Sequence, residues 1–328
     1  MTLLDVRDLK VHFPLGPDAT LHAVDGVSFA VEEGDSFGIV GESGSGKSTT
    51  AQALMRLVEP TSGSVRLQDR DITHLGGAEL RKLRHLLQMV FQDPYSSLNP
   101  RLRAGAAVRE PLNLMNIGSR AQRERRVDEL FAAVGLHPDA KRLFPHQFSG
   151  GQRQRLCIAR AIASEPRLVV CDEPVSALDV AIQAQILNLL RRLQQEQRLT
   201  YVFISHDLAV VQHICTHVAV MYSGQFVEKA PVKQLFSAAK HPYTWSLMAA
   251  ALSPDDRRRK ESRFTVTGEP PSPINPSSTA CRFAGRCPFA TEKCRTERPV
   301  LTKIGDGHEV ACHYAETLTP PMPELAAA

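Results

Sequence analysis

Residues 41–48, with the sequence Gly-Glu-Ser-Gly-Ser-Gly-Lys-Ser, constrain the fold of this chain more than any other stretch. They fit G-x-x-x-x-G-K-[ST], the pattern of a loop that cradles nucleotide phosphates. The apolar run at 37–40 predicts a buried strand before the loop, and residues 49–57 predict a helix after it. Glycines let the backbone N–H groups turn inward, and the helix start adds a positive field. A chance Gly/Ser-rich turn is the alternative, which the flanking strand and helix disfavour.

The residue types in this loop predict how a nucleotide would be held. Lys47 is expected to reach the β- and γ-phosphates, and Ser48 is expected to hold Mg²⁺. The other predicted ATP contacts of the segment are Gly41, Ser43, Gly44, Ser45, Gly46 and Thr49.

A second nucleotide motif follows downstream. The apolar run at 168–171 predicts a buried strand, and it ends in Asp172-Glu173-Pro174. This pattern fits a Walker B element, in which Asp172 binds the Mg²⁺ complex and Glu173 polarises the attacking water. The pattern is weak alone, but beside a phosphate loop in the same chain it strongly indicates nucleotide hydrolysis.

Length and composition are ordinary for a soluble globular protein. The 328 residues allow one large domain with an appendage, or two domains, and 43% are hydrophobic. The net charge of +4 does not argue for nucleic acid or a membrane surface. No apolar run approaches the roughly 18 residues of a membrane span, and residues 1–10 lack the pattern of a secretion signal. We therefore expect a cytoplasmic chain that needs partner chains for any transmembrane work.

Predicted strands and helices alternate along the chain, which indicates an α/β fold with a mostly parallel sheet and helices on both faces. Residues 94–142 differ, because they are mainly helical and contain a capping box, Ser119 with Gln122. We expect chain breaks at Asn99-Pro100 and at Glu110-Pro111. The pattern predicts a helical subdomain at about 94–165. Residues 218–222 and 225–229 predict a hairpin.

The composition changes after Ser253. We expect an ATP-binding domain at 1–253, an extension at 254–316 and a disordered tail at 317–328. The charged run at 255–263 contains Arg257-Arg258-Arg259-Lys260, which is interpreted as a solvated linker rather than a binding patch.

Four of the seven cysteines, Cys281, Cys287, Cys294 and Cys312, crowd the extension. In a reducing compartment such a cluster indicates a metal site before it indicates disulfides. The spacings are C-x5-C, C-x6-C and C-x17-C, without the C-x2-C pairs of common zinc sites. Two nearby arginines, Arg282 and Arg286, would offset thiolate charge or would be simple surface residues.

Residues 148–152, Phe-Ser-Gly-Gly-Gln, resemble the signature loop of the ABC ATPase family, which usually begins with Leu. The resemblance implies that Ser149, Gly150, Gly151 and Gln152 close over the γ-phosphate held by another subunit. It also implies the P-loop ABC ATPase fold: a mostly parallel sheet core, an antiparallel β subdomain and an inserted helical subdomain.

Other elements of the family occur in the expected order. Phe13 matches the aromatic residue that stacks on adenine, with a plain core role as the alternative. Gln92 matches the loop that senses nucleotide and touches the membrane subunit, Asp179 ends the D-loop at 176–179, and His206 matches the switch histidine. The resemblance implies that Glu173, His206 and Gln92 are catalytic and that Ser48, Gln92 and Asp172 hold Mg²⁺.

Further stretches resemble the oligopeptide/dipeptide importer branch of that family. They are Phe-Gln-Asp-Pro-Tyr-Ser-Ser-Leu-Asn-Pro-Arg at 91–101, Pro-His-Gln-Phe-Ser-Gly-Gly-Gln-Arg-Gln-Arg at 145–155, His-Pro-Tyr-Thr at 241–244 and Gly-Glu-Pro-Pro-Ser-Pro at 268–273. The resemblance implies an ATP-hydrolysing subunit at the inner face of the cytoplasmic membrane. Its implied partners are a second related ATPase, two permeases and, indirectly, an external substrate-binding protein. Nickel, glutathione and sugars are the alternative cargoes.

In some members of that branch the four C-terminal cysteines hold a [4Fe–4S] cluster. The resemblance therefore implies the same ligands here, while zinc and unliganded thiols stay open as alternatives. A soluble ABC protein that acts on DNA or ribosomes is a rival function, but such proteins usually carry tandem cassettes or a long coiled-coil insertion. A regulatory subunit without hydrolysis is disfavoured because Glu173, His206 and the signature loop are intact.

Overall fold

The computed structural model describes residues 1–251, 266 and 268–320. The predicted linker at 255–263 with its basic run, the boundary after residue 253, and the tail beyond residue 320 lie outside the described residues. The chain forms two compact units. Unit 1 comprises Met1–Leu4, Val31–Asp35 and Leu67–Phe203, and unit 2 comprises Asp5–Ala30, Ser36–Arg66 and the described residues from Ile204 on.

The strands and helices follow the predicted alternation. The strands are β1 (Thr2–Gly16), β2 (Ala19–Glu32), β3 (Ser36–Val40), β4 (Ser62–Leu67), β5 (Arg70–Asp71), β6 (Leu87–Val90), β7 (Leu168–Asp172), β8 (Thr200–Ser205), β9 (His217–Tyr222), β10 (Gln225–Pro231), β11 (Thr302–Gly305) and β12 (His308–Val310). The helices are α1 (Lys47–Leu54), α2 (Gly77–Leu83), α3 (Pro94–Ser97), α4 (Ala104–Leu114), α5 (Arg120–Ala133), α6 (Gly150–Ala161), α7 (Val180–Gln197), α8 (Leu208–Ile214), α9 (Val232–Ala238), α10 (Pro242–Ala251) and α12 (Glu292–Thr296), with 3-10 turns at Pro138–Arg142 and Pro145–Gln147.

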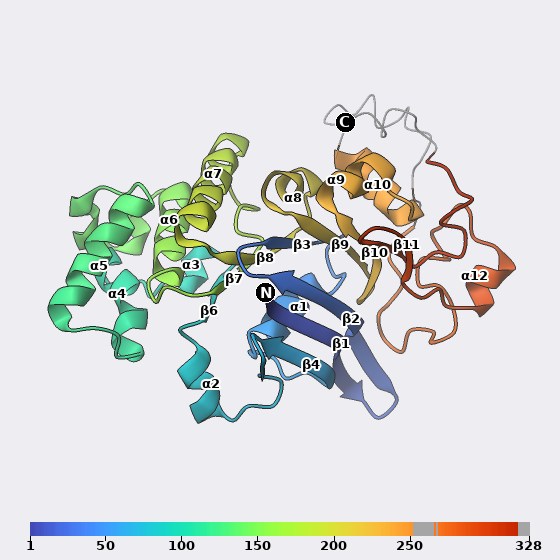
Figure 1. Cartoon of the computed structure of the whole chain (residues 1–328), viewed down its shortest axis with the longest axis horizontal. Helices are drawn as coiled ribbons and strands as arrows, with labels where there is room; N and C mark the ends of the chain where they lie inside the picture. Colours follow the sequence, from blue (N-terminus) through green and yellow to red (C-terminus); the bar gives the residue numbers. More distant parts are fainter. Residues whose placement is uncertain (252–265, 267, 321–328) are drawn as a thin grey trace. The chain divides into compact units, whose positions relative to one another are not determined.

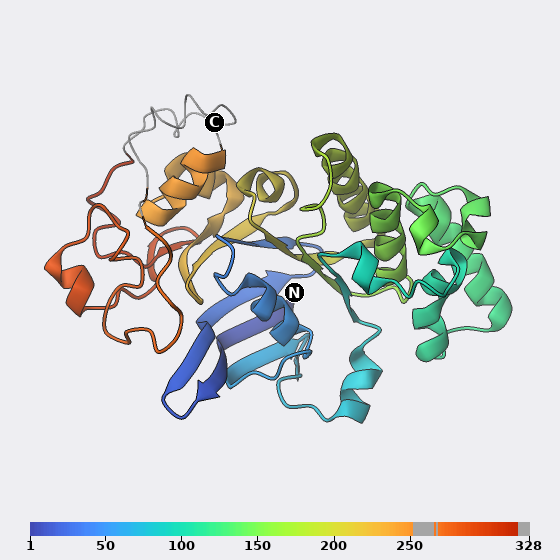
Figure 2. The same ribbon diagram turned by 180° about the vertical axis from the view of Figure 1, so that it is seen from behind.

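In unit 2 the strands are hydrogen-bonded in the order β11-β12-β10-β9-β3, and β2-β1-β4 form a second sheet. The strand before the phosphate loop, β3, is buried throughout and runs parallel to β9. The predicted hairpin is confirmed, since β9 and β10 pair antiparallel with Tyr222 opposite Gln225. Its two turn residues, Ser223 and Gly224, both have positive φ, which matches the twist of a tight hairpin. Figure 2 shows α9 and α10 beside this hairpin.

In unit 1 the strands are hydrogen-bonded in the order β8-β7-β6. Strands β6 and β7 are parallel, with Val90 opposite Cys171. Helices α4, α5 and α6 pack together in one cluster, visible in Figure 1. The capping box is confirmed, because Ser119 accepts from the Gln122 N–H while the Gln122 side chain accepts from the Ser119 N–H.

The predicted chain break at Glu110-Pro111 is wrong. Pro111 lies inside α4, and its side chain is buried. A proline within a helix costs about 3 kcal/mol through its missing N–H and its ring. Packing of α4 against α5 and α6 outweighs this local cost, as tertiary packing commonly does for short helices.

The extension adds structure to unit 2 that the sequence did not predict. Its strand β12 pairs antiparallel with β10, so that Glu228 lies opposite Val310. The fully buried carboxylate of Glu228 accepts from the N–H groups of Lys240 and His241 at 2.7 and 3.0 Å. It also lies 2.7 Å from the Nε2 atom of His308. Among the described residues, no helix combines the length and apolar character that a bilayer span requires.

Candidate nucleotide-binding site

At two positions of the loop at 41–48 the surroundings leave no room for a side chain. Gly46 has a φ of 104°, and a Cβ atom there would lie 2.1 Å from the carbonyl oxygen of Ala23. A Cβ atom on Gly41 would lie 2.2 Å from the carbonyl oxygen of Met221. The predicted tight loop between β3 and α1 is therefore enforced by its surroundings.

The donors of this loop fit an anionic ligand. Helix α1 begins after Gly46 without a side-chain cap and without an acidic residue in its first turn. Its first N–H groups therefore suit phosphate oxygens. Lys47 is buried, and its Nζ atom donates to the carbonyl oxygens of Gly41 and Glu42, each at 2.8 Å. The buried Ser45 hydroxyl has no hydrogen-bond partner among the described residues, which also fits a polar ligand.

In unit 1 the ends of two parallel strands bring a predicted catalytic pair together. Gln92 follows the end of β6, and Glu173 follows the end of β7 directly. The Nε2 atom of Gln92 donates to the Oε2 atom of Glu173 at 3.0 Å. Because an ionised carboxylate only accepts, this contact fixes the orientation of the amide.

The backbone of Glu173 is unusual. Its φ is 45°, in the left-handed region that non-glycine residues rarely adopt. Its carbonyl oxygen accepts from the N–H and the hydroxyl of Ser176 at 3.3 and 3.1 Å. Asp172, one position earlier, is buried at the end of β7. Residues held in such conformations cluster at functional sites, which supports a role for Glu173.

The signature loop begins α6 with a capping box of its own. Ser149 accepts from the N–H of Gln152, and the Gln152 side chain accepts from the N–H of Ser149. This box was not predicted, although Ser149 and Gln152 have the same spacing as Ser119 and Gln122. A Cβ atom on Gly151 would lie 2.6 Å from the Cγ2 atom of Ile182 on α7, so this glycine permits close helix packing.

The remaining predicted residues lie at the ends or edges of elements. His206 is exposed between β8 and α8, directly before Asp207, whose side chain caps α8. Phe13 is half-buried in β1, and Asp179 is the exposed N-cap residue of α7. Unit 2 carries Phe13, residues 41–49 and His206, whereas unit 1 carries Gln92, residues 149–152, Asp172, Glu173 and Asp179.

The four cysteines of the extension are free thiols in unit 2. The N–H of Cys281 donates to the carbonyl oxygen of Cys294 at 2.9 Å. Burial, reinforced by the neighbouring thiols, raises the pKa of Cys281 and of Cys287 to about 11. Among the described residues, no three of these sulfur atoms lie within 4.8 Å of one another. Tetrahedral zinc with Zn–S bonds of about 2.3 Å needs sulfurs about 3.8 Å apart, so a preformed zinc site is disfavoured.

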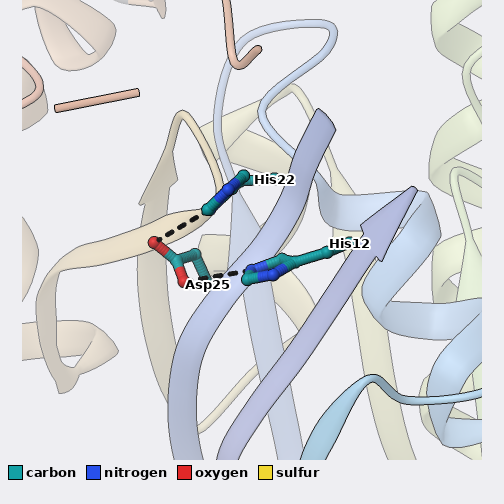
Figure 3. A group of neighbouring side chains, drawn as sticks. All are labelled: His12, His22 and Asp25. Atoms are coloured by element: carbon teal, nitrogen blue, oxygen red, sulfur yellow. Dashed lines mark hydrogen bonds and ion pairs between the residues drawn. The ribbon is translucent and has the colours of Figure 1, made fainter. Parts of the chain in front are cut away.

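One ligand-like group was not predicted: His12, His22 and Asp25 (Figure 3). Asp25 lies 3.2 Å from the Nε2 atom of His12 and 3.8 Å from the Nδ1 atom of His22. Its carboxylate also accepts from Gln225 and forms an ion pair with the buried Arg282. Burial opposes ionisation of Asp25, but Arg282 and His12 outweigh it and lower its pKa. Because the guanidinium of Arg282 already pairs with the Asp25 carboxylate, we interpret these residues as a polar contact between β2 and the extension rather than as a cation site.

Arg282 and Arg286 are neither thiolate partners nor simple surface residues. Their side chains are 5% and 10% exposed, and they pair with Asp25 and Glu42 respectively. Glu42 belongs to the phosphate loop, and Asp25 lies on β2 of the same unit. The extension is therefore ionically joined to the nucleotide-binding segments of its own unit.

Two family models match this chain. The family model described as ABC transporter matches residues 24–176, and the model for the oligopeptide/dipeptide transporter C-terminal region matches 227–294. The probable peptide ABC transporter ATP-binding protein y4tS of Sinorhizobium fredii is 50% identical over 95% of this chain and 89% of its own length. The oligopeptide transport ATP-binding protein AppF of Bacillus subtilis is 46% identical over 95% of this chain and 97% of its own length.

The chain belongs to the ABC transporter ATP-binding family. A solved structure described as the dimeric post-hydrolysis state of the ATP-binding cassette MJ0796 bound to ADP and Pi agrees, with a TM-score of 0.65 and 30% identity. The similarity covers 70% of this chain and 99% of the chain in that structure. The predicted ABC ATPase fold is thus confirmed. As a member of this family, the chain hydrolyses ATP with Mg²⁺.

Proposed function

We propose that this chain is the ATP-hydrolysing subunit of an importer for dipeptides or oligopeptides. The observation that carries the cargo class is the match of residues 227–294 to the C-terminal region of oligopeptide/dipeptide transporters. The names of the two relatives support it, since both refer to peptide or oligopeptide transport. The chain would act as a peripheral subunit at the inner face of the cytoplasmic membrane.

The catalytic roles follow from the donor sets. The backbone of 41–46, Lys47 and Thr49 would bind the phosphates, while Ser48, Gln92 and Asp172 would hold Mg²⁺. Glu173 would accept a proton from the attacking water, and the hydrogen bond from Gln92 would hold the Glu173 carboxylate in place. His206 would contact the γ-phosphate, and Phe13 would stack on adenine. Mg²⁺ itself would neutralise charge that develops on the phosphate oxygens.

Dimerisation completes the proposal. Residues 149–152 and Asp179 would act on nucleotide held by a second ATPase subunit, either a copy of this chain or a related one, and two permeases would couple the pair to cargo. Sedimentation of the Glu173→Gln variant with and without ATP–Mg²⁺, alone and with the related subunit, tests this. ATP-dependent association in either mixture is expected, and its absence in both would contradict the dimer.

We further propose that residues 254–316 form the C-terminal extension typical of oligopeptide/dipeptide transporters, in which Cys281, Cys287, Cys294 and Cys312 hold a [4Fe–4S] cluster. One feature supports the ligand set: all four cysteines are free thiols. Four thiolates are a complete ligand set for such a cluster. The cluster would serve structure, because ligand binding contributes folding energy to a small segment.

The test of cargo is a transport assay. The chain, its partner ATPase and its permeases are reconstituted in vesicles with the substrate-binding protein, and ATP hydrolysis is measured against dipeptides, oligopeptides, nickel, glutathione and sugars. Peptides are expected to stimulate hydrolysis. Stimulation by one of the other cargoes alone would replace the peptide assignment and leave the ATPase assignment intact. Failure to associate with permeases would favour a soluble function.

A further inference from the structure

The guanidinium of Arg286, in the extension, forms an ion pair with the side chain of Glu42 in the phosphate loop. Its Nη1 and Nη2 atoms donate to the two carboxylate oxygens of Glu42 at 2.8 and 3.1 Å. A bidentate pair of this kind fixes orientation as well as distance. The ring of Tyr222, at the end of β9, also lies under the guanidinium, 5.8 Å from its carbon atom.

Glu42 is held at its backbone as well. Its N–H donates to the hydroxyl of the fully buried Tyr243 at 2.8 Å. Its carbonyl oxygen accepts from the Nζ atom of Lys47 at 2.8 Å. The second residue of the phosphate loop therefore connects the extension directly to the lysine that binds phosphate.

The charge on Arg286 is secure. Burial alone would lower its pKa, but hydrogen bonds to Glu42 and Tyr222 outweigh burial and raise the pKa. A second contact anchors the same segment, because Arg282 pairs with Asp25 and donates to the carbonyl oxygen of Ser223. The short stretch 281–287 is thus joined to its own unit by two arginines, and the buried Phe283 between them packs against Tyr222 and Tyr243. Of the two arginines, only Arg286 pairs with a residue of the phosphate loop.

We propose that Arg286 is a positioning residue for ATP binding, which acts through Glu42 to hold the phosphate loop and Lys47 in place. The proposal rests on the ATPase assignment. It gives the extension a role in nucleotide affinity, independent of whether a cluster is bound. Glu42 places a negative charge beside a site for anionic phosphates, and Arg286 both neutralises that charge and fixes the loop.

Charge and position make opposite predictions for the partner residue. If Arg286 only cancelled the charge of Glu42, then removing Glu42 would leave an extra cation near the phosphates and tighten ATP binding. If Arg286 positions the loop, then Glu42→Ala releases the loop and weakens binding. The sign of the Glu42→Ala effect therefore separates the two explanations.

The experiment measures the Kd of the full-length chain for a fluorescent ATP analogue with Mg²⁺, for Arg286→Gln, Glu42→Ala and the double variant. Arg295→Gln, an exposed arginine of the same extension, is the matched control. Each single variant is expected to raise the Kd by about tenfold, within the coupling energies of residues in contact. The double variant is expected to bind no more weakly than the worse single variant, and Arg295→Gln is expected to bind normally.

Two further readouts distinguish positioning from misfolding. Arg286→Lys keeps the charge but loses the bidentate geometry, so its Kd is expected to lie between those of the unaltered chain and Arg286→Gln. In the assembled transporter, Arg286→Gln is expected to raise KM for ATP while kcat at saturating ATP stays close to normal. Unchanged affinity in Arg286→Gln, tighter binding in Glu42→Ala, or additive effects in the double variant would overturn the proposal. Absence of ATP binding by the unaltered chain would instead refute the proposed function.

Discussion

The side-chain amide of Gln92 donates to the carboxylate of Glu173 across the ends of two parallel strands, at 3.0 Å. The pairing of β6 with β7 places the two residues together, although they are 81 positions apart in the sequence. In the proposed function, the loop of Gln92 would sense nucleotide and Glu173 would act on water. The hydrogen bond would therefore couple the position of the Gln92 loop to the position of the Glu173 carboxylate.

The Gln92–Glu173 contact predicts that the two residues act as a unit in hydrolysis. Gln92→Ala removes the donor that orients the carboxylate, and we expect kcat of the assembled transporter to fall by about tenfold to a hundredfold. Gln92→Ala combined with Glu173→Gln is expected to lose less than the product of the two single losses, because residues in contact are not additive. Gln195→Ala, at an exposed position of α7, is the control. Multiplicative losses in the double variant would show that the two act independently.

The close approach of Gly151 to Ile182 predicts different costs for two adjacent alanine substitutions. A Cβ atom on Gly151 would lie 2.6 Å from a stiff β-branched side chain, whereas one on Gly150 would lie 3.4 Å from Leu178. Gly151→Ala is expected to lower the free energy of unfolding by about 1–3 kcal/mol. Gly150→Ala is expected to leave it unchanged or raise it slightly. Denaturant unfolding of the two variants measures the difference, and equal stabilities would show that α6 and α7 are farther apart.

The buried His241 predicts a loss of stability in acid. Burial lowers the pKa of His241 to about 4 from its usual 6.5. Its Nδ1 atom accepts a hydrogen bond from the N–H of Tyr243 at 3.1 Å. Protonation of Nδ1 would remove this acceptor and bring two N–H donors together. The unfolded chain binds the proton more readily, and stability is therefore expected to fall as pH drops from about 6.5 to about 4, by at most about 3 kcal/mol.

Thermal unfolding between these pH values checks the role of His241. His241→Asn keeps an acceptor at the start of α10 but does not titrate, so the curve of stability against pH is expected to be flatter than in the unaltered chain. The comparison concerns the slope, because the smaller side chain lowers stability at every pH. A slope equal to that of the unaltered chain would assign the acid sensitivity to other groups.

The cysteine proposal predicts brown protein after anaerobic purification, with iron and acid-labile sulfide in equal amounts. Cys287→Ser is expected to remove both and to loosen the segment beyond Gly268, while ATP binding at Lys47 persists, weakened by no more than Arg286→Gln weakens it. Cys215→Ser, a buried thiol elsewhere in unit 2, is the control and should keep its iron. Since the thiols must lose protons to bind metal, loading should decrease as pH falls. Colourless protein with zinc, or without metal, would rule out the cluster.

Features whose information is local were predictable from the sequence. The phosphate loop, the capping box at Ser119 and the hairpin around Ser223-Gly224 each depend on neighbouring residues, and the structure confirms them. The break at Pro111 was wrong because distant packing outweighs a local penalty. Strands β11 and β12 were missed because they are short, and β12 depends on pairing with the distant β10.

The partners of the two arginines show the same limit most clearly. Next to the cysteines, Arg282 and Arg286 suggested charge balance for thiolates. Their true acceptors are Asp25 and Glu42, and Glu42 is 244 positions away from Arg286 in the sequence. Local sequence contains no signal for such a contact. The tertiary fold of unit 2 creates it.

The rate of ATP hydrolysis by the reconstituted transporter, with the unaltered chain and with Glu173→Gln, tests the central claim most directly. Peptide-loaded binding protein should accelerate hydrolysis by the unaltered transporter. Glu173→Gln should still bind ATP, because the phosphate loop is unchanged, but its turnover should fall by about 10²–10⁴ through loss of the general base. Hydrolysis by Glu173→Gln at the rate of the unaltered chain would contradict the account.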